Sequence, residues 1–296
     1  MCIRDRLPVD PLVQVQLDQP DPVAGSDLFT VPTRNVPGMG YSGVNPPDTV
    51  GDIGMNYYIQ SINTGGGADV RIWDKATPPN VVTTFRMDSL GTGACAGGFG
   101  DPVVLYDRQA ERWMISEFAG SGNHLCVYVS QTGDPVAGGW FAYDFQTASF
   151  PDYPKYAVWS TDAEHGAGSY VATFNDDNIA SGGIMALERG AMIVGLPAST
   201  LPFQVEGLSG FVIQGPAPAD PDGPNPPPDG AAAILLRHRD TEVHDGPAAT
   251  ADLLEGWLFD VSWTDPGSTT WPPSPLVSTC GASFDALLPS PLRCLK

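Results

Sequence analysis

Three short motifs, each containing an aspartate, recur at an almost constant distance along the chain. They are Gly51-Asp52, Gly100-Asp101 and Pro151-Asp152, so the aspartates at 52, 101 and 152 stand 49 and then 51 residues apart. Each motif opens a run of short apolar stretches separated by turn residues, which is typical of antiparallel strands. A period near 50 residues that holds about four short strands is the repeat length of a propeller blade.

The clearest repeat covers residues 100–146, with strands expected at 103–106, 112–118, 125–130 and 140–145. Further strands are expected at 57–62, 70–73, 81–85, 156–159, 169–174, 183–187, 203–205, 210–214, 231–237 and 255–263, with a helical turn within 187–195. The predicted fold class is therefore all-β, a β-propeller of four-stranded blades with about five blades present. A β-sandwich also uses many short strands, but the period favours the propeller.

The chain divides by composition into four parts. Residues 1–6 resemble an artefactual leader, residues 7–40 form an irregular Pro-rich lead-in, residues 41–270 form the propeller, and residues 271–296 are a Pro-rich tail. The tail is interpreted as the start of a further, truncated blade, so we expect a ring that is not closed. An unclosed ring leaves exposed strand edges.

The charge balance excludes some partners. The 296 residues include 14 Lys and Arg against 34 Asp and Glu, a formal net charge of −20. A surface this acidic repels phosphate backbones, so nucleic-acid binding is not expected. No apolar run reaches the 18 or more residues of a spanning helix, so no membrane insertion is expected.

The five cysteines suggest an oxidising compartment. Cys95 and Cys126 flank the central repeat, and we expect them to form a disulfide. Cys280 and Cys294 form a second candidate pair, which leaves Cys2 without a partner. Free buried thiols are the alternative for each pair.

Several motifs together resemble a largely uncharacterised family of secreted bacterial β-propeller-like proteins. They are NPPDTVGDIGMNYYIQSIN, GDPVVLYDRQAERWMISEF, FPDYPKYAVW, PADPDGPNPPP and LLRHRDTEVHD followed by WLFDVSW, within residues 41–294. The resemblance implies a propeller-like fold and a secreted or cell-surface location. It supplies no catalytic residues.

The acids at the repeat starts are the first candidate site. Asp48, Asp52, Asp101 and Asp152 precede or open the first strand of successive blades, so they would converge at one mouth of the channel. Converging carboxylates bind calcium, or act as acid and base in glycoside cleavage with a partner such as Glu117. The alternative is that each aspartate only caps a turn.

A second candidate is the run from Arg237 to Asp245. If it is extended, alternate side chains share one face and two of the four could bind a metal; these four are His238, Asp240, Glu242 and His244. A charged hairpin end is the alternative. The Asp220–Asn225 segment only faintly resembles a calcium loop, because it lacks the distal glutamate.

No sequence motif for a metalloprotease, an α/β-hydrolase, a P-loop or a dinucleotide site is present. The sequence therefore favours a non-enzymatic recognition or adhesion module on a cell surface, whose partner is a glycan, a protein or a matrix polymer, with calcium as the one cofactor to consider. The alternative is a secreted hydrolase that cleaves glycans through Asp and Glu pairs at the channel mouth. A spacer without any pocket is a third reading.

Overall fold

The structure is a computed structural model. It describes residues 35–161, 167–176, 181–208, 215–221, 225–228, 230–244, 252–271 and 275–279. The leader, most of the lead-in, most of the tail, the strand expected at 210–214 and the cysteines at 2, 280 and 294 lie outside the described residues.

Four antiparallel sheets make up the fold, and in each the four strands pair in chain order. Sheet 1 holds β1 (Val50–Ile53), β2 (Tyr57–Thr64), β3 (Gly67–Asp74) and β4 (Val81–Arg86). Sheet 2 holds β5 (Gly98–Asp107), β6 (Arg112–Ala119), β7 (His124–Ser130) and β8 (Trp140–Gln146). Sheet 3 holds β9 (Pro151–Trp159), β10 (Ser169–Asp176), β11 (Ser181–Glu188) and β12 (Thr200–Val205). Sheet 4 holds β13 (Ala217–Pro218), β14 (Ala233–Arg239), β15 (Leu253–Phe259) and β16 (Leu276–Thr279).

The helical segments are short. They are η1 (Met87–Leu90), η2 (Gly93–Ala96), α2 (Arg189–Met192), α3 (Thr241–His244) and η3 (Pro266–Ser268). The helical turn expected within 187–195 is confirmed by α2. None of the helices in the described ranges is long and apolar enough to cross a membrane.

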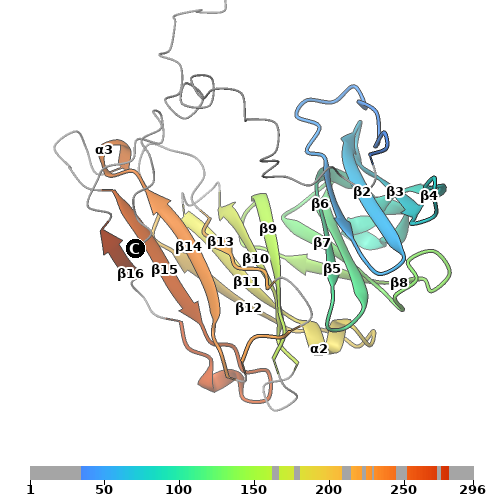
Figure 1. The fold of residues 1–296 in the computed structure, drawn as a ribbon. Helices are drawn as coiled ribbons and strands as arrows, with labels where there is room; N and C mark the ends of the chain where they lie inside the picture. The colour runs from blue at the N-terminus through green and yellow to red at the C-terminus, as the bar shows by residue number, and fades with distance from the viewer. Residues whose placement is uncertain are drawn as a thin grey trace, which may run out of the picture.

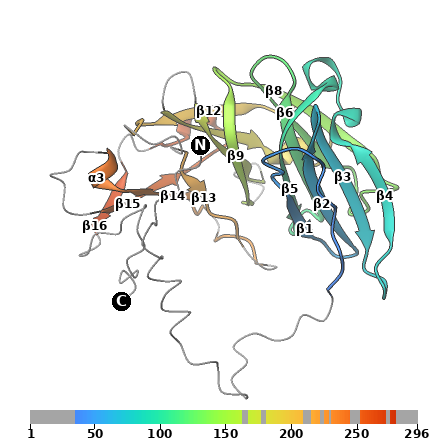
Figure 2. The ribbon, with the colours of Figure 1, turned by 90° about the horizontal axis from the view of Figure 1, so that it is seen from above.

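The sheets stand side by side in an arc, with sheet 1 and sheet 4 at its two ends (Figures 1 and 2). The first strand of each sheet lies toward the inside of the arc, and these inner strands contact one another: β1 with β5, β5 with β9, and β9 with β13. A β-sandwich would have two sheets, so this alternative is wrong.

Side-chain alternation explains how one sheet contributes to two cores. In β6, Trp113 and Ile115 face sheet 1, whereas Met114 and Phe118 face sheet 3. Successive side chains of a strand point to opposite faces, so an apolar strand such as β6 is buried on both. The same alternation gives a core between sheets 3 and 4 that includes Trp159 and Trp257.

The all-β fold class and the repeat are confirmed for the first three sheets. Their first strands begin at Val50, Gly98 and Pro151. The expected five blades are not confirmed, since the described residues form four sheets. Sheet 4 takes more chain than the others, because residues 219–232 separate β13 from β14. The proline-rich run 216–230 was expected to stay out of a sheet, but β13 lies within it, as a two-residue strand at the sheet edge, where proline is tolerated.

The predicted disulfide is confirmed. Cys95 in η2 is bonded to Cys126 in β7, across 31 residues of sequence. Both cysteines are buried in the core between sheets 1 and 2. The bond is compatible with an oxidising compartment.

Candidate functional site

Three of the predicted acids come together at the inner edge of the arc. A cavity of about 310 Å³ is lined by Asp48 and Asp101, with Tyr153 and Lys155 on its other side. Asp152 directly precedes Tyr153 and is close enough to act electrostatically on Asp101. We call this cavity, with its three carboxyls from the starts of three successive sheets, the acid cavity.

Strained backbone surrounds the acid cavity. Asp48, Asp101 and Tyr153 have φ angles of 40°, 51° and 53°, in the left-handed region. Glu111 and Ala167 are the other two described non-glycine residues with positive φ. Aspartate tolerates this region better than most residues, but each such residue still costs of order 1–3 kcal/mol, and strain of this kind concentrates at functional sites.

A buried asparagine in β2 holds two of the acids together. The Asn63 side-chain amide donates from Nδ2 to Asp48 Oδ2 at 2.6 Å, and Asn63 Oδ1 accepts the Asp101 backbone N–H at 2.9 Å. Gly100 leaves the room for this contact: a Cβ there would lie 2.5 Å from Asn63 Oδ1, and its φ is 109°. Sequence reasoning missed Asn63, although the glycine before Asp101 signalled a close approach.

The electrostatics of the cavity set Asp101 apart. Burial, followed by the neighbouring carboxyls of Asp48 and Asp152, raises the pKa of Asp101 from 3.8 to about 6. The Asp101 carboxyl is also hydrogen-bonded to the Asp48 carboxyl. A carboxyl beside other carboxyls keeps its proton to a higher pH, because their negative charge disfavours its ionised form.

One cation faces the three acids. Lys155 Nζ lies 3.2 Å from the centroid of the Tyr153 ring and donates to the Pro154 carbonyl at 3.3 Å. Burial lowers the pKa of Lys155, although Asp101, Asp48 and Asp152 act in the opposite direction. The Tyr153 side chain remains 45% exposed, so its ring is available to a bound molecule. The sequence carried no signal for Lys155.

Asp52 does not line the acid cavity. Its Oδ2 accepts the Tyr106 backbone N–H at 2.7 Å, and its Oδ1 accepts the Ile53 N–H at 2.6 Å. Asp52 therefore joins sheet 1 to the inner strand of sheet 2. Asp220 does the same between sheets 4 and 3, since its Oδ1 accepts the Val158 N–H at 2.8 Å.

Glu117 is a buried carboxyl outside the acid cavity, between sheets 1 and 2. Its side chain is 1% exposed, its Oε2 accepts the Ala68 N–H at 2.9 Å, and its Oε1 has no hydrogen-bond partner. Burial, followed by the charge of Asp88, raises the pKa of Glu117 to about 8.

The metal site predicted between 238 and 244 does not form as expected. Only His238 lies in a strand; β14 ends at Arg239, and α3 begins at Thr241. The His244 backbone N–H donates to the Asp240 carbonyl at 2.9 Å, which closes a helical turn. The expectation of one extended face is therefore wrong, and the Glu242 side chain lies outside the described residues.

Among the residues that the structure describes, no three or more His, Cys, Asp or Glu side chains form a group that could hold a metal ion. In the Asp220–Asn225 segment, Asp220 is a bridge between sheets, and residues 222–224 lie outside the description. The calcium prediction has no support in these residues.

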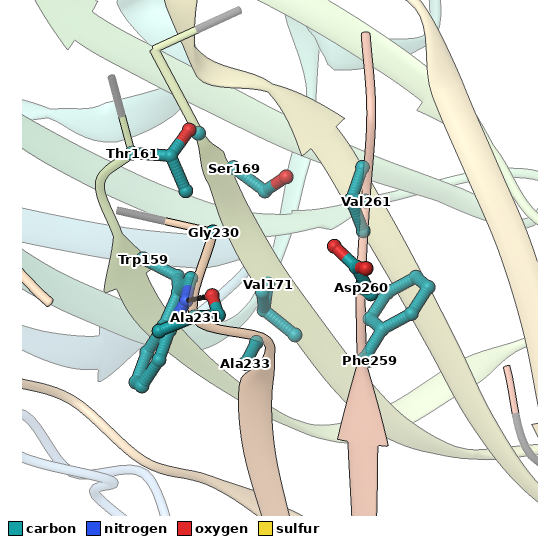
Figure 3. A pocket seen from close by; sticks show the side chains of 11 residues that line it. Trp159, Thr161, Ser169, Val171, Gly230, Ala231, Ala233, Phe259, Asp260 and Val261 are labelled. Carbon is teal, nitrogen blue, oxygen red and sulfur yellow. Dashed lines mark hydrogen bonds between the residues drawn. The ribbon is translucent and has the colours of Figure 1, made fainter. Parts of the chain in front are cut away.

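A second hollow lies between sheets 3 and 4 but is almost filled. Trp159, Val171, Phe259 and Asp260 are among its lining residues, and the Trp159 indole N–H donates to the Ala231 carbonyl at 2.8 Å (Figure 3). Its cavity volume is about 10 Å³. That volume holds at most one water molecule, so this hollow is packing and not a ligand site.

Comparison with protein families and with curated proteins finds no match. Comparison with solved structures finds a GH43 β-1,3-galactosidase, with 15% sequence identity and a TM-score of 0.40 over 78% of this chain. The aligned part covers 46% of that structure, so the chain spans less than half of its length. At this TM-score the likeness decides neither the fold nor the activity of this chain.

Proposed function

We propose that the acid cavity is the active site of a secreted glycoside hydrolase. The observation that carries the proposal is the environment of Asp101. Its pKa of about 6 gives it a proton to donate in mildly acidic to neutral solution, while the other two carboxyls act on it as negative charges. A carboxyl that keeps its proton close to other carboxyls is what glycoside cleavage requires of its general acid.

Each residue of the acid cavity then has a role. Asp101 protonates the glycosidic oxygen as general acid. Asp152 is the carboxylate that activates water or attacks the sugar, and Asp48, oriented by Asn63, raises the pKa of Asp101. The exposed Tyr153 ring offers an apolar surface to a sugar, and Lys155 balances part of the negative charge.

The proposal also concerns how the four sheets are arranged. We infer that the four sheets are blades of a β-propeller, of which the described residues form an open arc. Support comes from the chain-order pairing in every sheet and from the contacts between inner strands. The acid cavity would then lie at one mouth of the central channel, where first strands of successive blades begin.

Hydrolysis is preferred over the non-enzymatic recognition or adhesion module that the sequence favoured. A general acid requires a carboxyl that keeps its proton near neutral pH, whereas a surface that binds a neutral glycan does not. The hydrolase would act on a glycan, whereas the recognition module was expected to bind a glycan, a protein or a matrix polymer. A secreted or cell-surface location remains the expectation for both.

The test is hydrolysis of aryl glycosides and neutral polysaccharides by the full chain and its Asp101→Asn variant. We expect the variant to lose about 10²–10⁴-fold in kcat/KM, the usual contribution of a general acid. Asp265→Asn, an exposed acid in a turn after β15, is the control and should retain full activity. The proposal fails if no substrate is cleaved faster by the parent chain than by Asp101→Asn.

A further inference from the structure

A larger cavity lies on the outer face of sheet 1, away from sheet 2. Its volume is about 360 Å³, and its floor is formed by Tyr58, Gln60 and Trp73. One wall is the covering segment 35–38, and the opposite wall is the loop after β3, with Asp74 and Lys75. Volumes of this size, apolar with a few converging polar groups, are typical of small-molecule sites.

The aromatic floor is fixed in place. The Tyr58 and Trp73 ring centroids lie 5.6 Å apart at 41°. The Arg71 guanidinium lies 5.7 Å from the centroid of the Trp73 ring, on the same side of the sheet. Gly51 on β1 gives Tyr58 its room, since a Cβ there would lie 2.7 Å from the Tyr58 hydroxyl oxygen.

Polar groups on the floor are left without partners. Among the residues that the structure describes, none is hydrogen-bonded to the Tyr58 hydroxyl or to the Trp73 indole N–H. The Gln60 Oε1 accepts the Met39 backbone N–H at 2.7 Å, which orients the amide and leaves its NH₂ group to donate. Three neutral donors therefore lie next to two aromatic rings. The Asp74 carboxylate on the wall already accepts the backbone N–H groups of Ala76 and Asn80 and the Asn80 side-chain amide.

We propose that this cavity binds one neutral sugar unit as a non-catalytic subsite. A sugar presents a C–H face to an aromatic ring and hydroxyls that both donate and accept. A purely apolar occupant would leave the three donors buried and unpaired, at about 1–3 kcal/mol each. A proline-rich peptide uses aromatic grooves too, and its binding here is one outcome of the test below. The net charge of −20 disfavours a phosphorylated ligand.

The position of the subsite suits a polymer. Ile53 at the end of β1 lines the sugar subsite, and Val50 at its start lines the acid cavity. The two cavities thus border opposite ends of one four-residue strand. A polymer bound at the sugar subsite is held near the acid cavity, which raises its effective concentration there. This inference rests on the proposed function, because that function makes a glycan the expected ligand. The arrangement of rings and donors in the cavity does not depend on it.

The test is calorimetric titration of the full chain with neutral gluco-, galacto-, manno-, xylo- and arabino-oligosaccharides, in the Asp101→Asn background so that the probes stay intact. We expect at least one series to bind. Tyr58→Ala should weaken that binding by about tenfold or more, the factor that corresponds to roughly 1.4 kcal/mol. Trp73→Phe, which keeps a ring but removes the N–H, should weaken it less.

Tyr41→Ala, an exposed tyrosine beyond the cavity, is the matched control and should bind as the parent does. Thermal unfolding of each variant separates lost binding from lost folding. Failure of every oligosaccharide to bind, equal binding by Tyr58→Ala, or tighter binding of a proline-rich peptide at Tyr58 would overturn the subsite. If oligosaccharide binding depends on Tyr58 but no substrate is hydrolysed, only the proposed activity is overturned. If hydrolysis depends on Asp101 but no oligosaccharide binds through Tyr58, only the subsite is overturned.

Discussion

The two ends of β5 each carry an aspartate, and the two are used in opposite ways. Asp107, at the end of the strand, is fully buried and is bonded by Arg189 through Nε at 2.6 Å and Nη2 at 2.9 Å, and by the Tyr170 hydroxyl at 2.9 Å. Asp101, near the start, faces two other carboxyls. One aspartate thus joins two sheets at the end of β5, whereas the other, near the start of β5, has a raised pKa.

The difference teaches that the neighbours of a carboxyl, and not its burial alone, decide its use. Burial disfavours the charged form of either group. For Asp107 a guanidinium offsets that cost, whereas for Asp101 two like charges add to it. Glu117 is a third case. It is buried, and one of its oxygens is hydrogen-bonded while the other is not. Burial and then the charge of Asp88 raise its pKa, while the charge of Arg86 lowers it.

The largest effect is expected from breaking the Asp107–Arg189 pair. Asp107→Ala should destabilise the fold by about 3–5 kcal/mol, because it leaves the Arg189 charge buried and unpaired. Urea unfolding measures the loss. The control is Asp144→Ala, which removes a more exposed pair with His124 at 2.5 Å and should cost about 0–1 kcal/mol. Equal losses in both variants would contradict the role given to Asp107.

A smaller, pH-dependent effect is expected from Glu117. A carboxyl whose pKa is raised in the folded state binds more protons there than in the unfolded chain, so stability falls as pH rises toward the folded pKa of about 8. Between pH 6 and 8 the parent should lose at most about 1.4 kcal/mol per pH unit.

Glu117→Gln should remove that loss, because the amide is neutral at every pH in this window. Denaturant unfolding at a series of pH values gives the slope. Glu111→Gln, an exposed residue in the turn before β6, should keep the slope of the parent. An unchanged slope in Glu117→Gln would show that the buried carboxyl is not the group that titrates.

The smallest effect is expected from Asp48→Asn in the acid cavity. Asp48→Asn removes one of the two charges that act on Asp101, so the pKa of Asp101 should fall below about 6. It should stay above the ordinary 3.8, since burial is the first cause of the shift. Carbon-13 NMR titration of the Asp101 carboxyl measures it directly. If the pKa of Asp101 does not change, the charge of Asp48 is not a cause of its shift. Asp265→Asn is the control and should leave the pKa of Asp101 unchanged.

The sequence determined much of the architecture. Alternation along segments such as 112–118 requires strands buried on both faces, and the repeat of about 50 residues requires several equivalent sheets. These are properties of local pattern and period, which a chain carries without its partners. The restarts drew attention to Asp48, Asp101 and Asp152, but they also included Asp52, which does not line the acid cavity.

Only the tertiary structure decided what each acid does. Asp52 and Asp101 occupy equivalent places in the sequence repeat, yet Asp52 accepts two backbone N–H groups and Asp101 faces two carboxyls. The run after His238 has the pattern of a strand face, but the chain turns helical at Thr241. Hydrogen-bond partners and local charge come from residues far apart in sequence, such as Asn63 for Asp101. Their positions are set by how the sheets pack, and a local pattern does not contain that information.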